Sequence, residues 1–374
     1  MDAQVVKGKL KTIISLLVGA LFVYWFAYKL DWLAVWNEVR DANWAQLGLA
    51  LSLLIGTYFV RVLRWRTLLQ PMAQPSLRAL FRATVIGFSA LFVMGRAAEI
   101  IVRPAALSVK EKIRPSASYA TVMVERVFDM VMVVVFFAIN LVFFEHIPSD
   151  ADAMKIFGWI KVTGGLLLLA SIAGIYGLYS FRAHREAALD YLERKLNWLP
   201  VSVKKGIISL ITHIAESLSV LHDAKGLTLV VSYTVLLWLM VAVAHLLVVR
   251  AFDIPYRLIP FTGAVFVMGL SMVGSVVPTP GGATGPFHTA TAASLAFLGI
   301  DQTKAASVAI ILHLVIFTPA TFFGMYYLAK EGLSLENLKS IGEKQADDVE
   351  KHNPEADLAE SPAAEEEKVA AMQS

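Results

Sequence analysis

The chain has 374 residues, of which 57% are hydrophobic and 17% are charged, with a formal net charge of +3. A soluble chain carries about 25% charged residues, so this composition excludes an ordinary soluble globular protein. Cysteine is absent, which excludes a disulfide framework, thiolate chemistry and a cysteine metal site. Several runs approach the ~20 apolar residues that cross a bilayer, so we expect an all-α polytopic membrane protein.

The first apolar run, residues 10–28, is longer than the apolar core of a signal peptide. We expect it to be the first transmembrane helix, retained in the mature protein. A second span is expected at residues 44–63. It runs into a basic cluster that the positive-inside rule places in the cytoplasm, made of Arg61, Arg64, Arg66, Arg78 and Arg82.

The next apolar stretch, residues 83–95, has basic residues on both sides. As a helix it covers roughly 20 Å, which is short of the ~30 Å hydrocarbon core. Its length and flanking charges predict a re-entrant hairpin that enters from the cytoplasm and returns there. An ordinary span with a basic outer loop is the alternative.

Further spans are expected at residues 118–144, 157–181, 227–249 and 305–329. The basic segment 182–225 contains one apolar helical stripe, residues 203–221, which indicates a cytoplasmic or interfacial amphipathic helix. We therefore assign residues 1–329 to a transmembrane domain. Residues 330–374 are predominantly acidic and are expected to form a disordered cytoplasmic tail.

Two apolar arms within residues 261–299 flank the sequence V-P-T-P-G-G-A-T-G-P-F-H. Broken backbone at membrane depth is tolerated only where protein buries it or where it lines a watery cavity. The pattern predicts a second broken or re-entrant hairpin and a binding site at the break. Its hinge residues are Pro278, Pro280, Gly281, Gly282 and Gly285.

With two re-entrant hairpins, six of the eight hydrophobic segments cross the membrane and both termini are cytoplasmic. Each half then reads span, span, hairpin, span. The second half begins with the opposite orientation, which is the pattern of an inverted-topology repeat in transporters.

Charged residues next to the first hairpin are the first candidate site. Arg96, Glu99 and Arg103 fall near one face of a helix, and guanidinium groups suit phosphate or carboxylate ligands. Headgroup snorkelling with a structural ion pair is the alternative. Charges within a membrane segment are functional candidates by default.

A second charged set lies in the span at 118–144. Glu125, Arg126 and Asp129 lie within one or two helical turns, and Arg126 can reach Asp129. Substrate contact and a structural network that ties this helix to the first hairpin are both consistent with the spacing.

The break itself supplies the third set, which is Thr279, Thr284 and His288. Helix ends at a break expose backbone N–H and C=O groups, and helix N-termini attract anions. His288 can bind a phosphate or relay a proton, or it can be a packing residue. For His245 and His313, which lie within spans, we expect interior hydrogen bonds.

No cluster has metal-ligand spacing, nucleophile–base order or a phosphate-loop signature, so we expect no metal and no cofactor. The sequence gives no argument for an enzyme. Nothing in it points to nucleic acid as a partner.

Three ordered stretches resemble the transmembrane region of lysylphosphatidylglycerol synthases, a family that includes stand-alone, flippase-like proteins. They are G-R-A-A-E-I-I-V-R-P-A-A-L, A-T-V-M-V-E-R-V-F-D-M-V and V-P-T-P-G-G-A-T-G-P-F-H. The segment G-I-D-Q-T-K-A-A-S-V-A-I-I-L-H is similar to the end of this region, and the resemblance covers roughly residues 10–329. It implies translocation of aminoacylated phospholipids, glycolipids or polyprenyl-linked lipids.

The chain departs from the resemblance in two respects. The soluble aminoacyltransferase domain is missing, so lysyl transfer is not expected. Many members carry Glu after Pro-Gly-Gly, whereas the polar residue nearby is His288.

Our hypothesis is a bacterial inner-membrane flippase that moves an anionic or zwitterionic membrane lipid. Arg96 and Arg103 would hold the headgroup phosphate. The alternative is an integral-membrane transferase or accessory subunit acting on lipid-linked sugars, and a third is a scaffold. A homo-oligomer and a lipid-modifying enzyme partner are both compatible with the sequence.

Overall fold

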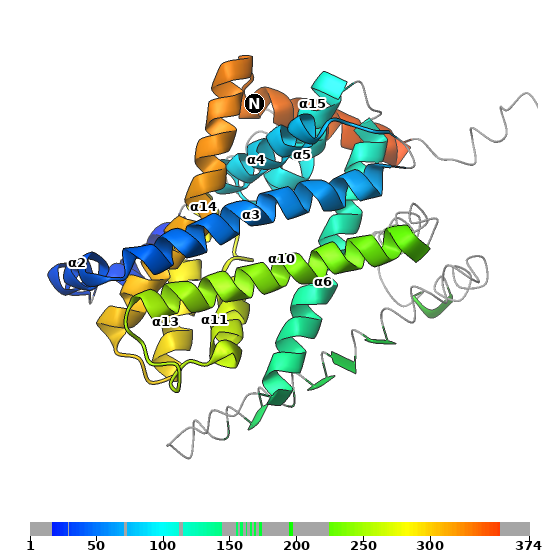
Figure 1. The fold of residues 1–374 in the computed structure, drawn as a ribbon. Coiled ribbons are helices and arrows are strands. Elements are labelled where there is room, and N and C mark those ends of the chain that lie inside the picture. Colours follow the sequence, from blue (N-terminus) through cyan, green and yellow to red (C-terminus); the bar gives the residue numbers. More distant parts are fainter. Residues whose placement is uncertain are drawn as a thin grey trace, which may run out of the picture.

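The computed structural model describes residues 17–28, 30–70, 73–111, 115–143 and 224–351, with isolated positions between 155 and 196. All regular secondary structure among these residues is helical (Figure 1). Four described helices are long and apolar enough to cross a membrane. A fifth span results if the sharply bent pair Leu17–Ala27 and α2 (Trp32–Asp41) counts as one. The expected all-α multi-pass membrane fold is therefore confirmed.

Four long helices form the frame: α3 (Trp44–Leu69), α6 (Pro115–Phe143), α10 (Ala224–Ala251) and α14 (Gln302–Glu331). They correspond to four of the expected spans, although the four described helices that are long and apolar enough to cross a membrane include Leu77–Met94 and not α6. Helices α3 and α10 pack side by side (Figure 1). The expected span at 157–181 and the amphipathic stripe at 203–221 lie outside the described residues, apart from scattered positions.

Local signals fix where these helices begin and end. The side chain of Asn43 accepts a hydrogen bond from the Gln46 amide at the start of α3. Asp301 does the same for the Lys304 amide at the start of α14. Gly332, in the left-handed region, ends α14.

The first break is a helical hairpin of α4 (Leu77–Met94) and α5 (Arg96–Glu111), joined at Gly95. Gly95 has a φ of 93°, which favours glycine. The two arms run back along each other, because Ser76 Oγ lies 3.0 Å from Glu111 Oε1 at the open end. At 18 residues α4 is longer than the expected arm and is itself long enough to span a membrane.

The second break is a hairpin of α11 (Phe261–Gly274) and α13 (Pro286–Phe297), with the single turn α12 (Pro280–Ala283) at its tip. The two arms are in contact, since the hydroxyl groups of Ser271 and Thr291 lie 2.7 Å apart. The hinge glycines have left-handed backbone, with φ values of 72° at residue 281, 69° at residue 282 and 95° at residue 285.

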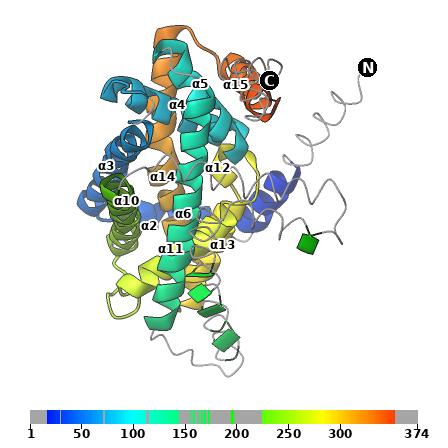
Figure 2. The same ribbon diagram turned by 90° about the vertical axis from the view of Figure 1, so that its right-hand side faces the viewer.

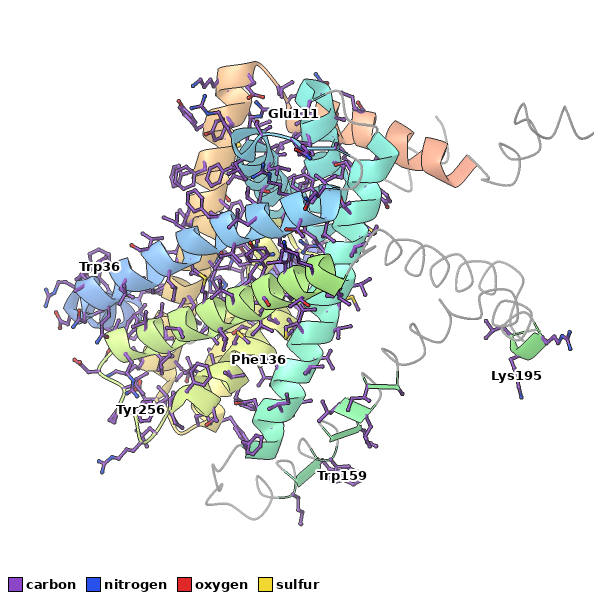
Figure 3. The ribbon with its side chains drawn as sticks, turned by 45° about the vertical axis from the view of Figure 1, so that its right-hand side comes forward. Trp36, Glu111, Phe136, Trp159, Lys195 and Tyr256 are labelled. Atoms are coloured by element: carbon purple, nitrogen blue, oxygen red, sulfur yellow. The ribbon has the colours of Figure 1, made fainter. Side chains whose placement is uncertain are left out.

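The two hairpins open towards opposite ends of the bundle. Figure 3 shows Glu111, the last residue of the first hairpin, at one end of the bundle. Tyr256, which precedes the second hairpin, lies at the other end. In Figure 2, α12 lies between the α4–α5 hairpin above and the α11 and α13 arms below. Contacts between α12 and α4 bring the two tips together.

Helix packing follows a two-fold pattern between the halves. The first hairpin packs against α14, where Ser89 Oγ donates to the Ala320 carbonyl oxygen at 3.2 Å. The second hairpin packs against α6, where the rings of Phe137 and Phe266 lie 6.3 Å apart. The contact of α3 with α4 corresponds to the contact of α10 with α11. In the same way, the contact of α5 with α6 corresponds to the contact of α13 with α14. This reciprocity is what an inverted repeat around the α3–α10 contact would produce.

The C-terminal segment differs from the expected disordered tail. Residues Leu335–Lys351 form helix α15, which packs against α5. The expectation was wrong here because Leu338 and Ile341 form an apolar stripe within the charged sequence, and Leu338 is fully buried. Residues 352–374 lie outside the described part of the chain.

Candidate functional site

A cluster of seven charged side chains lies between α3, α5, α6 and α10, and we call it the ion cluster. Arg64 on α3 binds Asp129 on α6 through two hydrogen bonds, of 2.7 and 3.2 Å. The Nε group of Arg64 also donates to Glu125 at 3.2 Å. From α10, Thr234 accepts from Arg64 at 3.1 Å and Trp238 donates to Asp129 at 3.3 Å. Three helices, α3, α6 and α10, therefore meet at these charges.

The remaining members connect α5 to α6. Arg103 donates to Glu125, and Arg126 donates to Glu99 at 3.0 Å. The guanidinium of Arg103 lies 3.9 Å from the ring centre of Trp65, which is a cation–π contact. These pairs form the network between the 118–144 span and the first hairpin that the sequence left open as one interpretation. The members are Arg61, Arg64, Glu99, Arg103, Glu125, Arg126 and Asp129.

Burial raises the free-energy cost of any unmatched charge in the ion cluster. Its side chains are between 0% and 20% exposed, and Arg126 is the most exposed. Four arginines face three carboxylates, so among the described residues one positive charge has no acidic counterpart. The Nε and Nη2 atoms of Arg103 and the Nε atom of Arg126 are buried without a hydrogen-bond partner. An anion placed here would satisfy donors that otherwise cost free energy.

The structure brings together Glu99, Arg103, Glu125, Arg126 and Asp129 from two separate predicted sets. Glu99 and Arg103 are fully buried inside the bundle rather than exposed at a headgroup surface. Arg96 is the first residue of α5, and its side chain lies outside the described part.

Sequence reasoning missed Arg61 and Arg64, because it grouped them with the cytoplasmic arginines that follow. A signal was present, since they lie three residues apart within the apolar helix α3, on one face, and charges there need partners.

At the second hairpin, side chains satisfy the backbone of the break. Thr279 Oγ1 donates to the Thr284 carbonyl at 3.2 Å, and Thr284 Oγ1 donates to the Gly281 carbonyl at 2.5 Å. The Gly285 amide donates to His288 Nδ1 at 3.2 Å. The polar groups that we expected to attract a ligand are thus partly used to hold the tip in shape.

The expected interior hydrogen bonds of the two other membrane histidines are present. His245 Nδ1 lies 2.8 Å from the Val241 carbonyl oxygen, and His313 Nε2 lies 3.3 Å from that of Gly282. His313 also lies beside His288, with ring centres 4.5 Å apart, which sequence spacing does not indicate.

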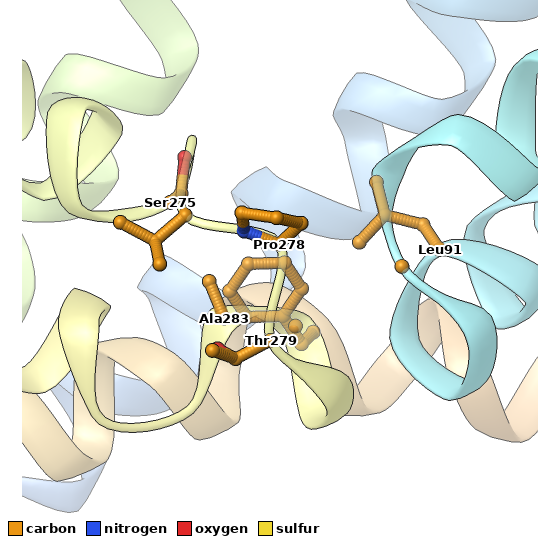
Figure 4. A pocket seen from close by; sticks show the side chains of 9 residues that line it. Leu91, Ser275, Pro278, Thr279 and Ala283 are labelled. Atoms are coloured by element: carbon orange, nitrogen blue, oxygen red, sulfur yellow. The ribbon is translucent and has the colours of Figure 1, made fainter. Parts of the chain in front are cut away.

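A small pocket separates the two hairpin tips, and we call it the tip pocket (Figure 4). Leu91 and Gly95 contribute to it from the first hairpin, and Phe317 contributes from α14. The rest of the wall comes from the second tip, namely Ser275, Val277, Pro278, Thr279, Gly282 and Ala283. Its lining is apolar or small, so the ion cluster and the contact between the tips are separate features.

Comparison with known proteins decides the family. Residues 12–324 match the family model described as the lysylphosphatidylglycerol synthase TM region. The chain belongs to this family. Neither the curated proteins nor the solved structures contain a match. The family match covers both hairpins, the ion cluster and the tip pocket, so these features lie within the shared region.

Proposed function

We propose that this family member moves a lipid with an anionic phosphate headgroup between the two leaflets of a membrane. The observation that carries the proposal is the ion cluster, in which four buried or largely buried arginines face three buried carboxylates. A charge without a counterpart at membrane depth is costly and marks a pathway for a charged substrate. A phosphate would supply both the negative charge and the acceptors that Arg103 and Arg126 lack.

Within this proposal the residues have separate roles. Arg103 and Arg126 contact the phosphate, and Arg96 receives the headgroup at the start of α5. Glu99, which has one unpartnered oxygen, binds a cationic group in a zwitterionic or aminoacylated headgroup. Asp129 and Glu125 hold the arginines in place through the pairs already described.

The two hairpins would form the gates. Both are re-entrant in this proposal, and their tips meet at the tip pocket. The hinge residues Pro278, Pro280, Gly281, Gly282 and Gly285 allow the second tip to move, while Thr279 and His288 fix its closed shape. Alternating separation of the hairpins from the bundle would expose the headgroup site to one leaflet and then to the other.

We place the protein in the bacterial cytoplasmic membrane with both termini in the cytoplasm. The basic ends of α3 and of the α4–α5 hairpin support this orientation, because Lys and Arg concentrate on the cytoplasmic side.

Leaflet exchange of fluorescent phosphatidylglycerol in proteoliposomes tests the proposal. Wild-type protein should accelerate exchange above protein-free vesicles, and Arg103→Gln should abolish the acceleration. Arg103→Lys retains the charge but loses the planar fork, so it should retain only part of the activity while folding normally. Arg40→Gln, at an exposed arginine on α2, is the matched control. Exchange at the wild-type rate in both Arg103 variants would rule out the assignment.

A further inference from the structure

His288 on α13 and His313 on α14 form a buried imidazole pair beside the second tip. Their ring centres are 4.5 Å apart, and the side chains are 9% and 5% exposed. Aromatic rings surround the pair. The ring of Phe26 lies 5.2 Å from His288, and those of Phe317 and Phe92 lie 4.8 and 6.4 Å from His313.

Hydrogen-bond partners fix the proton positions of the neutral pair. A carbonyl oxygen only accepts, so His313 Nε2 carries the proton that it shares with the Gly282 carbonyl. An amide only donates, so His288 Nδ1 is unprotonated where it accepts from Gly285. Each imidazole therefore makes a hydrogen bond to a backbone group of the break, and the neutral form of each imidazole is able to make it.

Addition of a proton disturbs this arrangement. On His288 Nδ1 it would replace the acceptor for the Gly285 amide by a second donor. On either ring it would place a cation among phenyl groups, and an apolar surrounding disfavours a charge without a partner. Two adjacent cations would repel each other, so the pair accepts one proton at a time. A cation is therefore favoured only when the tip opens to water.

Other titratable groups do not face the pair among the described residues. On the N-terminal helix Leu17–Ala27, Phe26 contacts the pair, whereas Tyr24 is 63% exposed and contacts Tyr28. Helix α4 presents Phe92, and α13 carries no further ionisable side chain. On α14 the other ionisable groups lie near its ends, namely Lys304, Tyr326, Tyr327, Lys330 and Glu331.

We infer that His288 and His313 form a single-proton site whose occupancy opens the second hairpin. The closed tip corresponds to the neutral pair, and the open, hydrated tip corresponds to the protonated pair. Because coupling is reciprocal, anything that opens the tip also favours uptake of a proton. The idea that proton binding drives lipid movement rests on the proposed function. The idea that a proton opens the tip does not.

The two-fold helix pattern adds an independent argument. In the first half, α5 and α6 are joined by ion pairs, as between Arg103 and Glu125. In the second half, the corresponding contact between α13 and α14 contains the histidine pair. One half therefore carries buried ion pairs at this contact, and the other carries a pair of side chains whose charge depends on pH.

Single-cysteine labelling tests this inference, because the natural chain has no cysteine. Ser275→Cys places a thiol in the wall of the tip pocket, and Val276→Cys, at a position 67% exposed, corrects for the pH dependence of the reagent. The labelling rate at residue 275, divided by that at residue 276, should rise several-fold between about pH 8 and about pH 5.5, since a histidine that the open tip exposes to water gains its proton in this range.

Two further substitutions remove the proton site and keep its hydrogen bonds. In His288→Asn the amide oxygen replaces Nδ1 as acceptor, and in His313→Gln the amide nitrogen replaces Nε2 as donor. The double variant should show the low, closed ratio at both pH values. His245→Asn, at a buried histidine on α10, should leave the response unchanged.

A flat ratio in the wild-type background overturns the inference, and so does a response that persists in the double variant. If the double variant is labelled fast at both pH values, His288→Asn and His313→Gln are each measured alone. A pH response that persists in both single variants then overturns the inference. The labelling needs no lipid substrate. If only the proposed function fails, the ratio still responds to pH while lipid exchange is absent.

Discussion

Arg64 and Asp129 form a buried ion pair with two hydrogen bonds, which joins α3 to α6. Asp129 lies at the midpoint of α6, among predominantly apolar residues. Arg61 and Arg126 also approach Asp129, within 3.5 and 3.7 Å. One carboxylate thus pairs with three guanidinium groups, those of Arg61, Arg64 and Arg126.

Asp129→Asn should destabilise the fold by about 3–5 kcal/mol, because removal of one partner leaves buried positive charge uncompensated. The free energy of unfolding in detergent or bicelles measures this loss. Asp41→Asn breaks an exposed pair with Arg40 and should have little effect. Equal stability of the two variants would show that the Asp129 carboxylate is not needed to balance the arginines.

The first hairpin depends on a close contact between its arms. A Cβ atom at Gly87 would lie 2.8 Å from Arg103 Cβ, so Gly87→Ala should force α4 and α5 apart. The expected cost is about 1–3 kcal/mol, as for other overpacked sites. Gly48→Ala on α3 meets nothing within 4 Å and should leave stability unchanged or slightly raised. Thermal unfolding of both variants, compared with wild type, checks this prediction.

At the second tip the matched substitutions are Gly282→Ala and Gly299→Ala. Both positions have positive φ, at 69° and 83°, so both variants incur backbone strain. Only at Gly282 would the new methyl group also meet Phe317, at 2.8 Å, whereas Gly299 has open space. The melting temperature should fall further for Gly282→Ala. An equal fall would mean that the tip does not pack against α14 as described.

Opposite openings of the two hairpins predict opposite accessibility at their bases. Gln74→Cys lies before α4 and Arg257→Cys lies before α11, and both positions are exposed. A membrane-impermeant maleimide should label one in intact cells and the other only in inverted vesicles. Reaction of both from the same side would contradict the inverted repeat.

The sequence predicted the features that depend on local properties. Apolar length indicated the long helices, and glycine and proline marked the tip of the second hairpin at residues 278–285. Glu99, Arg103, Glu125, Arg126 and Asp129 were selected because charge is rare in apolar helices. Helix α15 was missed because its apolar stripe is short, and its stability depends on packing against α5.

Contacts between distant segments were beyond sequence reasoning. Arg64 and Asp129 are 65 residues apart, and only the packing of α3 against α6 brings them together. His288 and His313 likewise meet because α13 packs along α14. Hydropathy gives the position of each helix along the chain but not which faces are neighbours, so a pair of this kind needs the folded bundle.

In the proposed mechanism the two tips must separate for a lipid to cross, and a reversible disulfide cross-link between them tests this step. Leu91→Cys and Val277→Cys place one thiol on each wall of the tip pocket. Leaflet exchange of fluorescent phosphatidylglycerol would be measured in proteoliposomes before oxidation, after cross-linking and after reduction. We predict exchange in the reduced protein, none in the cross-linked protein, and recovery on reduction. Equal exchange in the cross-linked and reduced protein, or none above protein-free vesicles in either, would contradict the account.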